Sequence, residues 1–196
     1  HIDHQIGRFL VALTENDLDR NTIIIFLSDH GDQLGEHHLF RKAYAYQGSV
    51  HIPFFIYDPG DLIKGDSRRI EEIVELRDVY PTLISLATKG KVDNIDGLDL
   101  SGTIENNEET RPYLHGEHFL GEASNQYIVT KDWKYIWHST TGEEQLFDLK
   151  HDPYEEKDLG GIAVFNKQKE ELKQLLITEL MNREEGFVKE GQLVVL

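Results

Sequence analysis

An aspartate and a histidine stand side by side where a buried strand is expected to end. Residues Ile23–Leu27 form a continuous apolar run, typical of a strand buried on both faces in a parallel sheet covered by helices. Asp29 and His30 follow, and Gly31 then allows a tight turn. Open α/β sheets carry their chemistry at the carboxyl ends of strands, so the pair is a candidate metal site. It is equally consistent with a polar loop in which Asp29 caps the next turn.

Two further side chains could take part in chemistry near such a site. Lys42 follows His30 by twelve positions and could supply a cation to an anionic substrate, although a lone lysine is usually a solvated surface residue. His118 ends the run His115-Gly116-Glu117-His118. Because a histidine titrates near neutral pH, His118 could position a substrate or donate a proton. His115 and His118 could also suggest a second metal, but such a pair is more often structural.

The first half of the chain reads as helices and apolar strands. Residues 1–16 carry an apolar stripe at helical spacing, which predicts an amphipathic helix. A second apolar strand spans 50–57, where Pro53 favours an edge position. Asp78 is expected to be the N-cap of a helix over 79–87. The polar stretch 91–111 reads as a surface linker.

The second half has a different pattern. Four short segments rich in β-branched and aromatic residues, joined by tight-turn signals, predict an antiparallel meander over 113–118, 126–130, 133–138 and 144–149. Leucines at helical spacing over 164–181 predict an amphipathic helix that covers this sheet. We therefore predict an α/β portion over residues 1–105 and an antiparallel sheet-and-helix subdomain over 106–196.

Between the first two strands lies a long loop rich in histidine and aromatic residues. We expect His37 to hydrogen-bond the loop backbone and Phe40 to pack against the sheet. Tyr44 and Tyr46 could line a substrate pocket or pack the loop onto the sheet, and the sequence leaves both roles open. The segment Phe119–Gln126 is a further candidate for determining substrate specificity.

Taken together, these segments resemble the C-terminal part of a sulfatase of the alkaline phosphatase superfamily. The similarity covers nearly the whole chain in the right order. It is carried by Ser28-Asp29-His30-Gly31-Asp32, Leu34-Gly35-Glu36-His37, Phe40-Arg41-Lys42, Gly48-Ser49-Val50-His51-Ile52-Pro53-Phe54, Leu76-Arg77-Asp78-Val79-Tyr80-Pro81-Thr82-Leu83, Trp133-Lys134-Tyr135-Ile136 and Gln145-Leu146-Phe147-Asp148-Leu149.

The resemblance implies a site and a cofactor. It makes Asp29 and His30 metal ligands and Lys42 a contact of the sulfate group and of the leaving oxygen. Ca²⁺ is the expected metal, but many sulfatases carry Asn where this chain has His30, and a nitrogen ligand also suits Mn²⁺ or Zn²⁺. His30 could instead donate a hydrogen bond to a substrate oxygen.

The sulfatase nucleophile is a formylglycine made from the motif Cys/Ser-x-Pro-x-Arg. The chain has no cysteine, and none of its five prolines lies in that pattern. We therefore expect a C-terminal fragment that lacks the nucleophile, is inactive alone, and tends to associate with itself through exposed strand edges and apolar faces. The parent protein is expected to hydrolyse a sulfate ester of a small molecule or a glycan. The alternatives are a phosphonate or phosphate ester hydrolase of the same superfamily, and a non-catalytic binding module.

Charge limits the partners. A formal net charge of −16 argues against binding to nucleic acid or to an anionic membrane surface. It also means that an anionic sulfate ester would need local positive charge from the metal, Lys42 and Arg41. The compartment stays open, with the bacterial periplasm or secretion as hypotheses.

Overall fold

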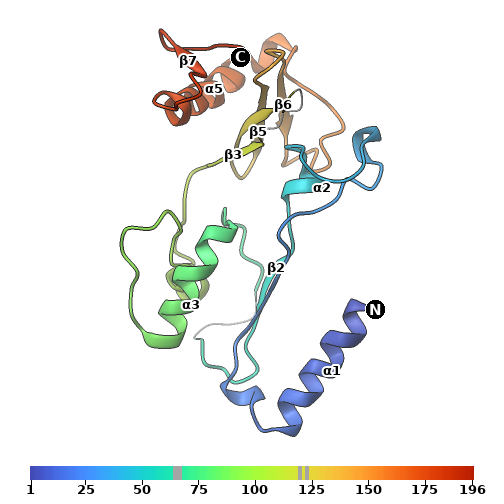
Figure 1. The fold of residues 1–196 in the computed structure, drawn as a ribbon, viewed down its shortest axis with the longest axis vertical. Coiled ribbons are helices and arrows are strands. Elements are labelled where there is room, and N and C mark those ends of the chain that lie inside the picture. Colours follow the sequence, from blue (N-terminus) through green and yellow to red (C-terminus); the bar gives the residue numbers. More distant parts are fainter. Residues whose placement is uncertain (64–67, 119–120, 122–123) are drawn as a thin grey trace. The chain divides into compact units, whose positions relative to one another are not determined.

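The computed structural model describes residues 1–63, 68–118, 121 and 124–196. Residues 119, 120, 122 and 123 of the expected specificity element lie outside the described residues. The helices and strands (Figure 1) are α1 (Ile2–Glu15), β1 (Ile24–Leu27), α2 (Gln47–Val50), β2 (Phe54–Tyr57), α3 (Val79–Thr88), α4 (Ser101–Asn106), β3 (Leu114–His118), β4 (Asn125–Val129), β5 (Trp133–His138), β6 (Glu144–Asp148), α5 (Asn166–Leu180), β7 (Val188–Lys189) and β8 (Gln192–Leu193).

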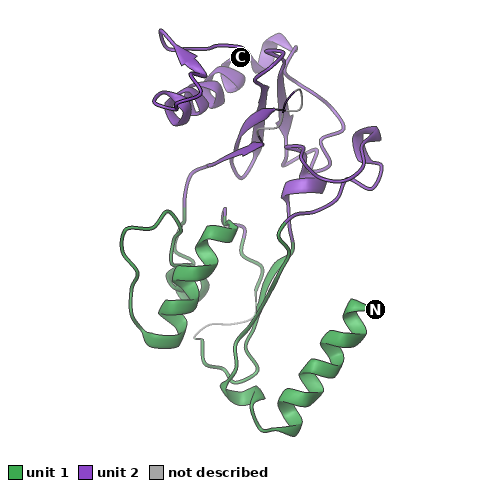
Figure 2. Ribbon diagram, viewed as in Figure 1, with its two compact units in different colours: residues 1–29, 53–70, 74–110 green, residues 30–52, 71–73, 111–196 purple. Residues whose placement is uncertain are grey.

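Two compact units make up the chain (Figure 2). Unit 1 contains His1–Asp29, Pro53–Ile70 and Val74–Thr110, and unit 2 contains His30–Ile52, Glu71–Ile73 and Arg111–Leu196. The two-part division predicted at residue 105 treated the long loop as part of the first portion. In the structure the loop residues His30–Ile52 group with the C-terminal sheet instead, because their contacts are made there.

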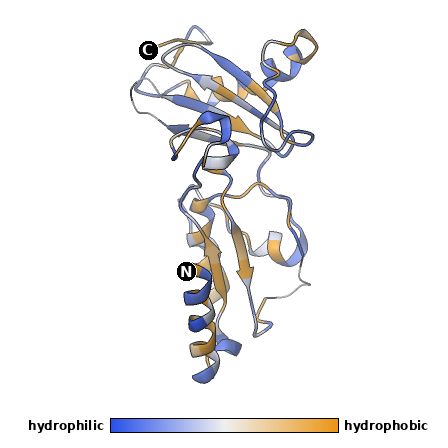
Figure 3. Ribbon diagram, turned by 90° about the vertical axis from the view of Figure 1, so that its right-hand side faces the viewer, coloured by the Kyte–Doolittle hydropathy of each residue, from blue (hydrophilic) through white to orange (hydrophobic). Residues whose placement is uncertain are grey.

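In unit 1, β1 and β2 form a two-stranded antiparallel sheet. The register pairs Ile24 with Tyr57 and Leu27 with Phe54. Both strands are strongly apolar (Figure 3), yet every β1 residue is only partly buried. The expectation of a parallel neighbour buried on both faces is therefore wrong for the described part of the chain, since the continuous apolar run does not specify strand direction. β2 begins directly after Pro53, because proline cannot donate to the ladder.

The helices of unit 1 match their predicted spans, with one correction. α1 and α3 lie where the apolar periodicity places them. Asp78, however, does not cap α3 through its side chain. Its buried carboxylate accepts hydrogen bonds from the backbone N–H groups of Glu75 and Leu98, each at 2.8 Å. The Glu75 contact is a local capping box at Leu76–Asp78, whereas the Leu98 contact joins a segment twenty residues away, which a local capping rule cannot foresee.

The polar stretch predicted as a linker contains a short helix. α4 lies within it, and Leu100 and Thr103 are buried there. Because Thr82 on α3 accepts a hydrogen bond from the Leu100 N–H at 2.9 Å, the stretch is packed against unit 1.

Unit 2 is built on the predicted antiparallel meander, in the order β3-β4-β5-β6. Side chains alternate between the two faces of such a sheet. One face packs against α5 and the tail. Its buried cluster consists of Ile128, Tyr135, Trp137, Leu146, Leu159, Leu172, Leu176, Leu180 and Phe187.

The opposite face of the same sheet is covered by the long loop. Ala45 from the loop is buried there against Ile136 and Phe147, with Tyr46 and Tyr127 packed beside them. We call this the loop face of the sheet. It carries three buried apolar residues, whereas the α5 face carries nine, so the α5 face holds most of the apolar core of unit 2.

The apolar tail also docks in unit 2. β7 and β8 form a hairpin, and Phe187 before it is fully buried, edge to face with Trp137 at 5.8 Å between ring centroids. Among the described residues, no helix has the length and apolar content needed to cross a lipid bilayer.

Candidate functional site

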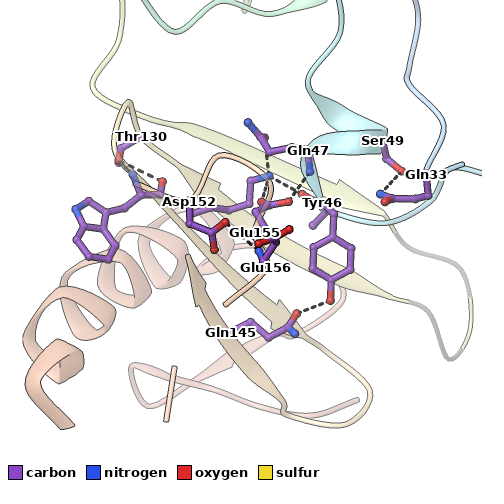
Figure 4. A network of polar contacts seen from close by, with 12 residues as sticks. Gln33, Tyr46, Gln47, Ser49, Thr130, Gln145, Asp152, Glu155 and Glu156 are labelled. Atoms are coloured by element: carbon purple, nitrogen blue, oxygen red, sulfur yellow. Dashed lines mark hydrogen bonds and ion pairs between the residues drawn. The ribbon is translucent and has the colours of Figure 1, made fainter. Parts of the chain in front are cut away.

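The long loop folds back on itself directly after His30. The Gly31 N–H donates to the Ser49 carbonyl at 2.8 Å, and a side chain at position 31 would bring a Cβ to 2.0 Å from the Gly48 carbonyl oxygen. Only glycine fits this approach. The Gln33 amide reinforces the closure by donating to the Ser49 hydroxyl at 3.0 Å (Figure 4).

His30 and Lys42 are brought into direct contact. The Lys42 ammonium donates to His30 Nε2 at 2.7 Å, and His30 Nδ1 lies 2.7 Å from the Gly31 carbonyl oxygen. A lysine ammonium has no acceptor, so Nε2 must accept and Nδ1 carries the proton that is donated to Gly31. The twelve-residue spacing in the sequence gave no signal of this contact, which depends on how the loop folds.

The Lys42 contact bears on the metal prediction. With one ring nitrogen accepting from Lys42 and the other donating to Gly31, His30 has no nitrogen directed toward a metal in this arrangement. The described residues contain no group of three or more His, Cys, Asp or Glu side chains arranged to hold a metal ion. Asp29 is the last residue of unit 1 and His30 the first of unit 2. The carboxylate of Asp29 suits a hard cation, whereas both ring nitrogens of His30 contact Gly31 and Lys42 in this arrangement.

The segment that presents Lys42 has a strained backbone. Left-handed φ angles flank it at Arg41 (71°) and Ala43 (85°). Further left-handed residues lie upstream at Leu34, His37 and His38. Each such non-glycine conformation costs about 1–2 kcal/mol. Strain of this kind persists only where surrounding contacts hold it, and it is concentrated at functional sites.

The aromatic residues of the loop behave differently from one another. Tyr46 packs on the loop face, edge to face with Phe147 at 6.0 Å, and its hydroxyl donates to Gln145 at 3.0 Å (Figure 4). Burial of the phenol raises the pKa of Tyr46. The structure shows His37 stacked on the Tyr46 ring at 4.0 Å. Phe40 is 71% exposed, so the expectation that it packs against the sheet is wrong.

His118 lies on the loop face of the sheet at the end of β3. Its buried Nε2 has no hydrogen-bond partner among the residues that the structure describes. It pairs with Asn125 on β4, and residues directly opposite on antiparallel strands share a face. The Asn125 amide donates to the carbonyl of Ala43, next to Lys42, at 3.4 Å. His118 on β3 thus lies opposite Asn125 on β4, and Asn125 contacts Ala43, the residue after Lys42.

His115 points to the other face of the sheet, because residues three apart on a strand alternate sides. Its Nε2 lies 2.8 Å from Gln126 Oε1. The two histidines therefore do not face a common ligand.

Comparison with known proteins places the chain in a family. A model of the family "Sulfatase" matches residues 1–89. The arylsulfatase of Clostridium perfringens is 49% identical over 196 residues, which cover 99% of this chain and 41% of that protein. The chain thus spans about two fifths of that relative.

Solved structures also match most of the chain. A protein solved in complex with its substrate D-glucosamine-2-N,6-O-disulfate matches 92% of this chain and 38% of its own, with 29% identity and a TM-score of 0.75. The phosphonate monoester hydrolase of Agrobacterium radiobacter matches 90% of this chain and 38% of its own, with 27% identity and a TM-score of 0.76. With motif order, fold and relatives in agreement, the chain belongs to the sulfatase family of the alkaline phosphatase superfamily.

Proposed function

We propose that the protein to which this chain belongs hydrolyses a sulfate ester, and that Lys42 binds the sulfate group and the departing oxygen. The observation that carries the proposal is the contact between Lys42 and His30. It holds an ammonium group at the end of the motif loop in a segment with a strained backbone. In a chain of formal net charge −16, such a fixed cation is what an anionic ester requires.

Lys42 acts on the leaving group. As the ester bond breaks, negative charge develops on the departing alkoxide or phenoxide, and a preorganised ammonium stabilises that charge more than it stabilises the ground state. His30 orients the ammonium by accepting a hydrogen bond from it. His118, on the loop face beside the Lys42 segment, is proposed to position the substrate or to donate a proton to the leaving oxygen.

The sequence of this chain contains no formylglycine motif, so the proposal assigns the nucleophile and the remaining metal ligands to other residues of the protein. A formylglycine, when present, would supply the nucleophile. The carboxylate of Asp29 is the proposed metal ligand of this chain, with Ca²⁺ favoured for its preference for oxygen and Mn²⁺ or Zn²⁺ as the alternatives if His30 exchanges Lys42 for the ion.

Asp29→Asn tests the ligand assignment in the full-length protein. We expect a loss of bound metal and of turnover, because an anionic ligand of a hard cation is removed. Metal content per protein is measured by elemental analysis. Asp32→Asn serves as a control, because it changes the same type of residue in the same loop. Normal metal content in Asp29→Asn would refute the assignment.

The substrate class is proposed as an aryl or glycan sulfate. One structural relative was solved with a disulfated glucosamine, and another is a phosphonate monoester hydrolase. The full-length protein should be assayed side by side on an aryl sulfate, a glucosamine 6-sulfate and an aryl phosphonate monoester. We expect the highest kcat/KM with a sulfate ester. A higher kcat/KM with the phosphonate would mean that the protein is a phosphonate ester hydrolase. No turnover of any of the three compounds would contradict both candidate functions.

A further inference from the structure

A fully buried ion pair lies directly beneath the loop that carries Lys42. Lys134 on β5 and Glu155, in the segment after β6, are 2.6 Å apart, and neither side chain is exposed to solvent. The Lys134 ammonium also donates to the Ala45 carbonyl and to Gln47 Oε1, each at 2.8 Å. Glu155 accepts the backbone N–H of Gln47 at 2.6 Å. Figure 4 shows these contacts converging on the start of α2.

Such a pair is costly to bury and adds little to stability by itself. Removing two charges from water costs several kcal/mol per ion, and an apolar pair of similar volume often serves folding equally well. Burial lowers the pKa of Lys134, against the opposing effect of Glu155. Glu155 also takes a left-handed φ of 59°. The α5 face on the other side of the sheet holds most of the apolar core of unit 2.

The pair holds one end of the long loop, residues His30–Ile52. The Lys134 ammonium donates hydrogen bonds to Ala45 and Gln47 and forms an ion pair with Glu155. Two of these partners belong to the loop. The third, Glu155, holds the loop again through the Gln47 N–H. The loop is thus attached to the ion pair by three polar contacts.

From this attachment, a continuous series of contacts leads to the proposed site. Gln47 begins α2, whose Ser49 carbonyl accepts the Gly31 N–H at 2.8 Å. The Gly31 carbonyl orients the His30 ring, and His30 accepts a hydrogen bond from the Lys42 ammonium. Ala45, held by Lys134, is three residues from Lys42, beyond the left-handed Ala43.

We propose that Lys134 and Glu155 are positioning residues, which hold α2 and the residues before it so that the strained segment presents Lys42 and His30 to the sulfate ester. This inference rests on the proposed function. Neither side chain reaches the substrate. Both act through the backbone of the loop, and their loss displaces the ammonium of Lys42 without removing it.

The central variant is the double substitution Lys134→Met/Glu155→Gln in the full-length protein. It leaves no unpaired buried charge, so the chain is expected to fold, but the donors to Ala45 and Gln47 are lost. The matched control is Lys173→Met. Lys173 forms an ion pair with Glu144 at the same distance of 2.6 Å, but it joins α5 to β6 on the other face of the sheet.

Two readouts distinguish positioning from general stability. We expect kcat for a sulfate ester with a poor leaving group to fall on the order of ten- to hundredfold in the double variant, as small misplacements of catalytic groups do, and kcat for an activated aryl sulfate to fall much less. We also expect the Gly31 amide proton to exchange at least about tenfold faster with solvent. Lys173→Met should change neither the ratio of the two kcat values nor the exchange of Gly31.

The possible failures can be told apart. An equal loss for both esters, or unchanged exchange at Gly31, overturns the positioning role. A wild-type protein that hydrolyses no ester overturns the proposed function instead, and the exchange of Gly31 then still decides whether the pair anchors the loop. A double variant that does not fold is replaced by Gln47→Ala, which keeps the buried ion pair, removes one of its contacts with the loop, and is judged by the same two readouts.

Discussion

At the scale of single residues, Lys42 and His30 divide the work between them. The ammonium supplies charge, and the imidazole supplies the acceptor that keeps the ammonium in place. An exposed lysine side chain otherwise samples many rotamers, and fixing it costs up to about 2 kcal/mol of side-chain entropy. The contact with His30 restricts the ammonium before any ligand binds, so part of that entropy is lost on folding.

Replacing Lys42 tests the leaving-group role. Lys42→Ala should lower kcat more for sulfate esters with poor leaving groups than for activated ones, because poor leaving groups carry more negative charge in the transition state. The measurement is the slope of log kcat against leaving-group pKa. Arg41→Ala is the neighbouring control. A slope equal to that of the wild type would make Lys42 an ordinary surface lysine.

The partnership with His30 is tested by a double-mutant cycle. If His30 acts by orienting Lys42, then His30→Ala should reduce kcat in wild type but have little further effect once Lys42 is alanine. Its effect on bound metal should be small, because both ring nitrogens are engaged by Gly31 and Lys42. Losses of kcat that add fully, or a loss of metal in His30→Ala, would favour a direct role as a metal ligand.

At the scale of elements, the four-stranded sheet of unit 2 serves two purposes, one on each face. The α5 face is apolar and stabilises the fold, as burial of Leu176, Leu180 and Trp137 indicates. The loop face combines a smaller apolar cluster with polar side chains, and it places the long loop through Lys134, Gln145 and Asn125. The alternation of side chains along each strand lets one sheet do both.

The core of this sheet makes a prediction about alkaline pH. Burial, followed by the negative charge of Glu144, raises the pKa of Tyr135. The unfolded chain therefore releases this proton first, and the stability that the group contributes is intact below about pH 10 and lost above it. Tyr135→Phe should reduce the fall in the free energy of unfolding by up to about 1.4 kcal/mol per pH unit above pH 10.

Denaturant unfolding from pH 8 to 11 measures this effect. Part of the decline should persist in Tyr135→Phe, because the pKa values of Tyr46 and Tyr113 are also raised. The control Tyr80→Phe, at an exposed position, should leave the decline unchanged. A decline in Tyr135→Phe as steep as that of the wild type would contradict the account.

At the scale of the whole molecule, residues 1–196 taken alone are expected to turn over no sulfate ester. The chain contains no cysteine and no Ser-x-Pro-x-Arg sequence from which a formylglycine could form. The assay is hydrolysis of an aryl sulfate with added Ca²⁺ or Mn²⁺, and light scattering on the same sample tests for self-association. Metal-dependent turnover by these residues would contradict the prediction that the nucleophile is absent from this chain.

Local patterns in the sequence were enough to predict most elements. The meander, the helix that covers it and the helices near residues 2–15 and 79–88 follow from periodicity and turn signals, which act over a few residues. The motif order likewise identified the family, because the identities at Asp29, His30 and Lys42 are a property of the chain alone.

Only the tertiary structure decided which residues meet. The antiparallel pairing of β1 with β2, the carboxylate of Asp78 between two loop segments, the exposure of Phe40 and the contact of Lys42 with His30 all depend on long-range closure. Lys134 is the clearest example. In the sequence it is one lysine in a strand. Its contacts appear only in the folded chain, where it meets Ala45 and Gln47, which are 89 and 87 positions away in the sequence. The reason is physical: propensity and periodicity are local, whereas burial and pairing of a charge depend on the whole fold.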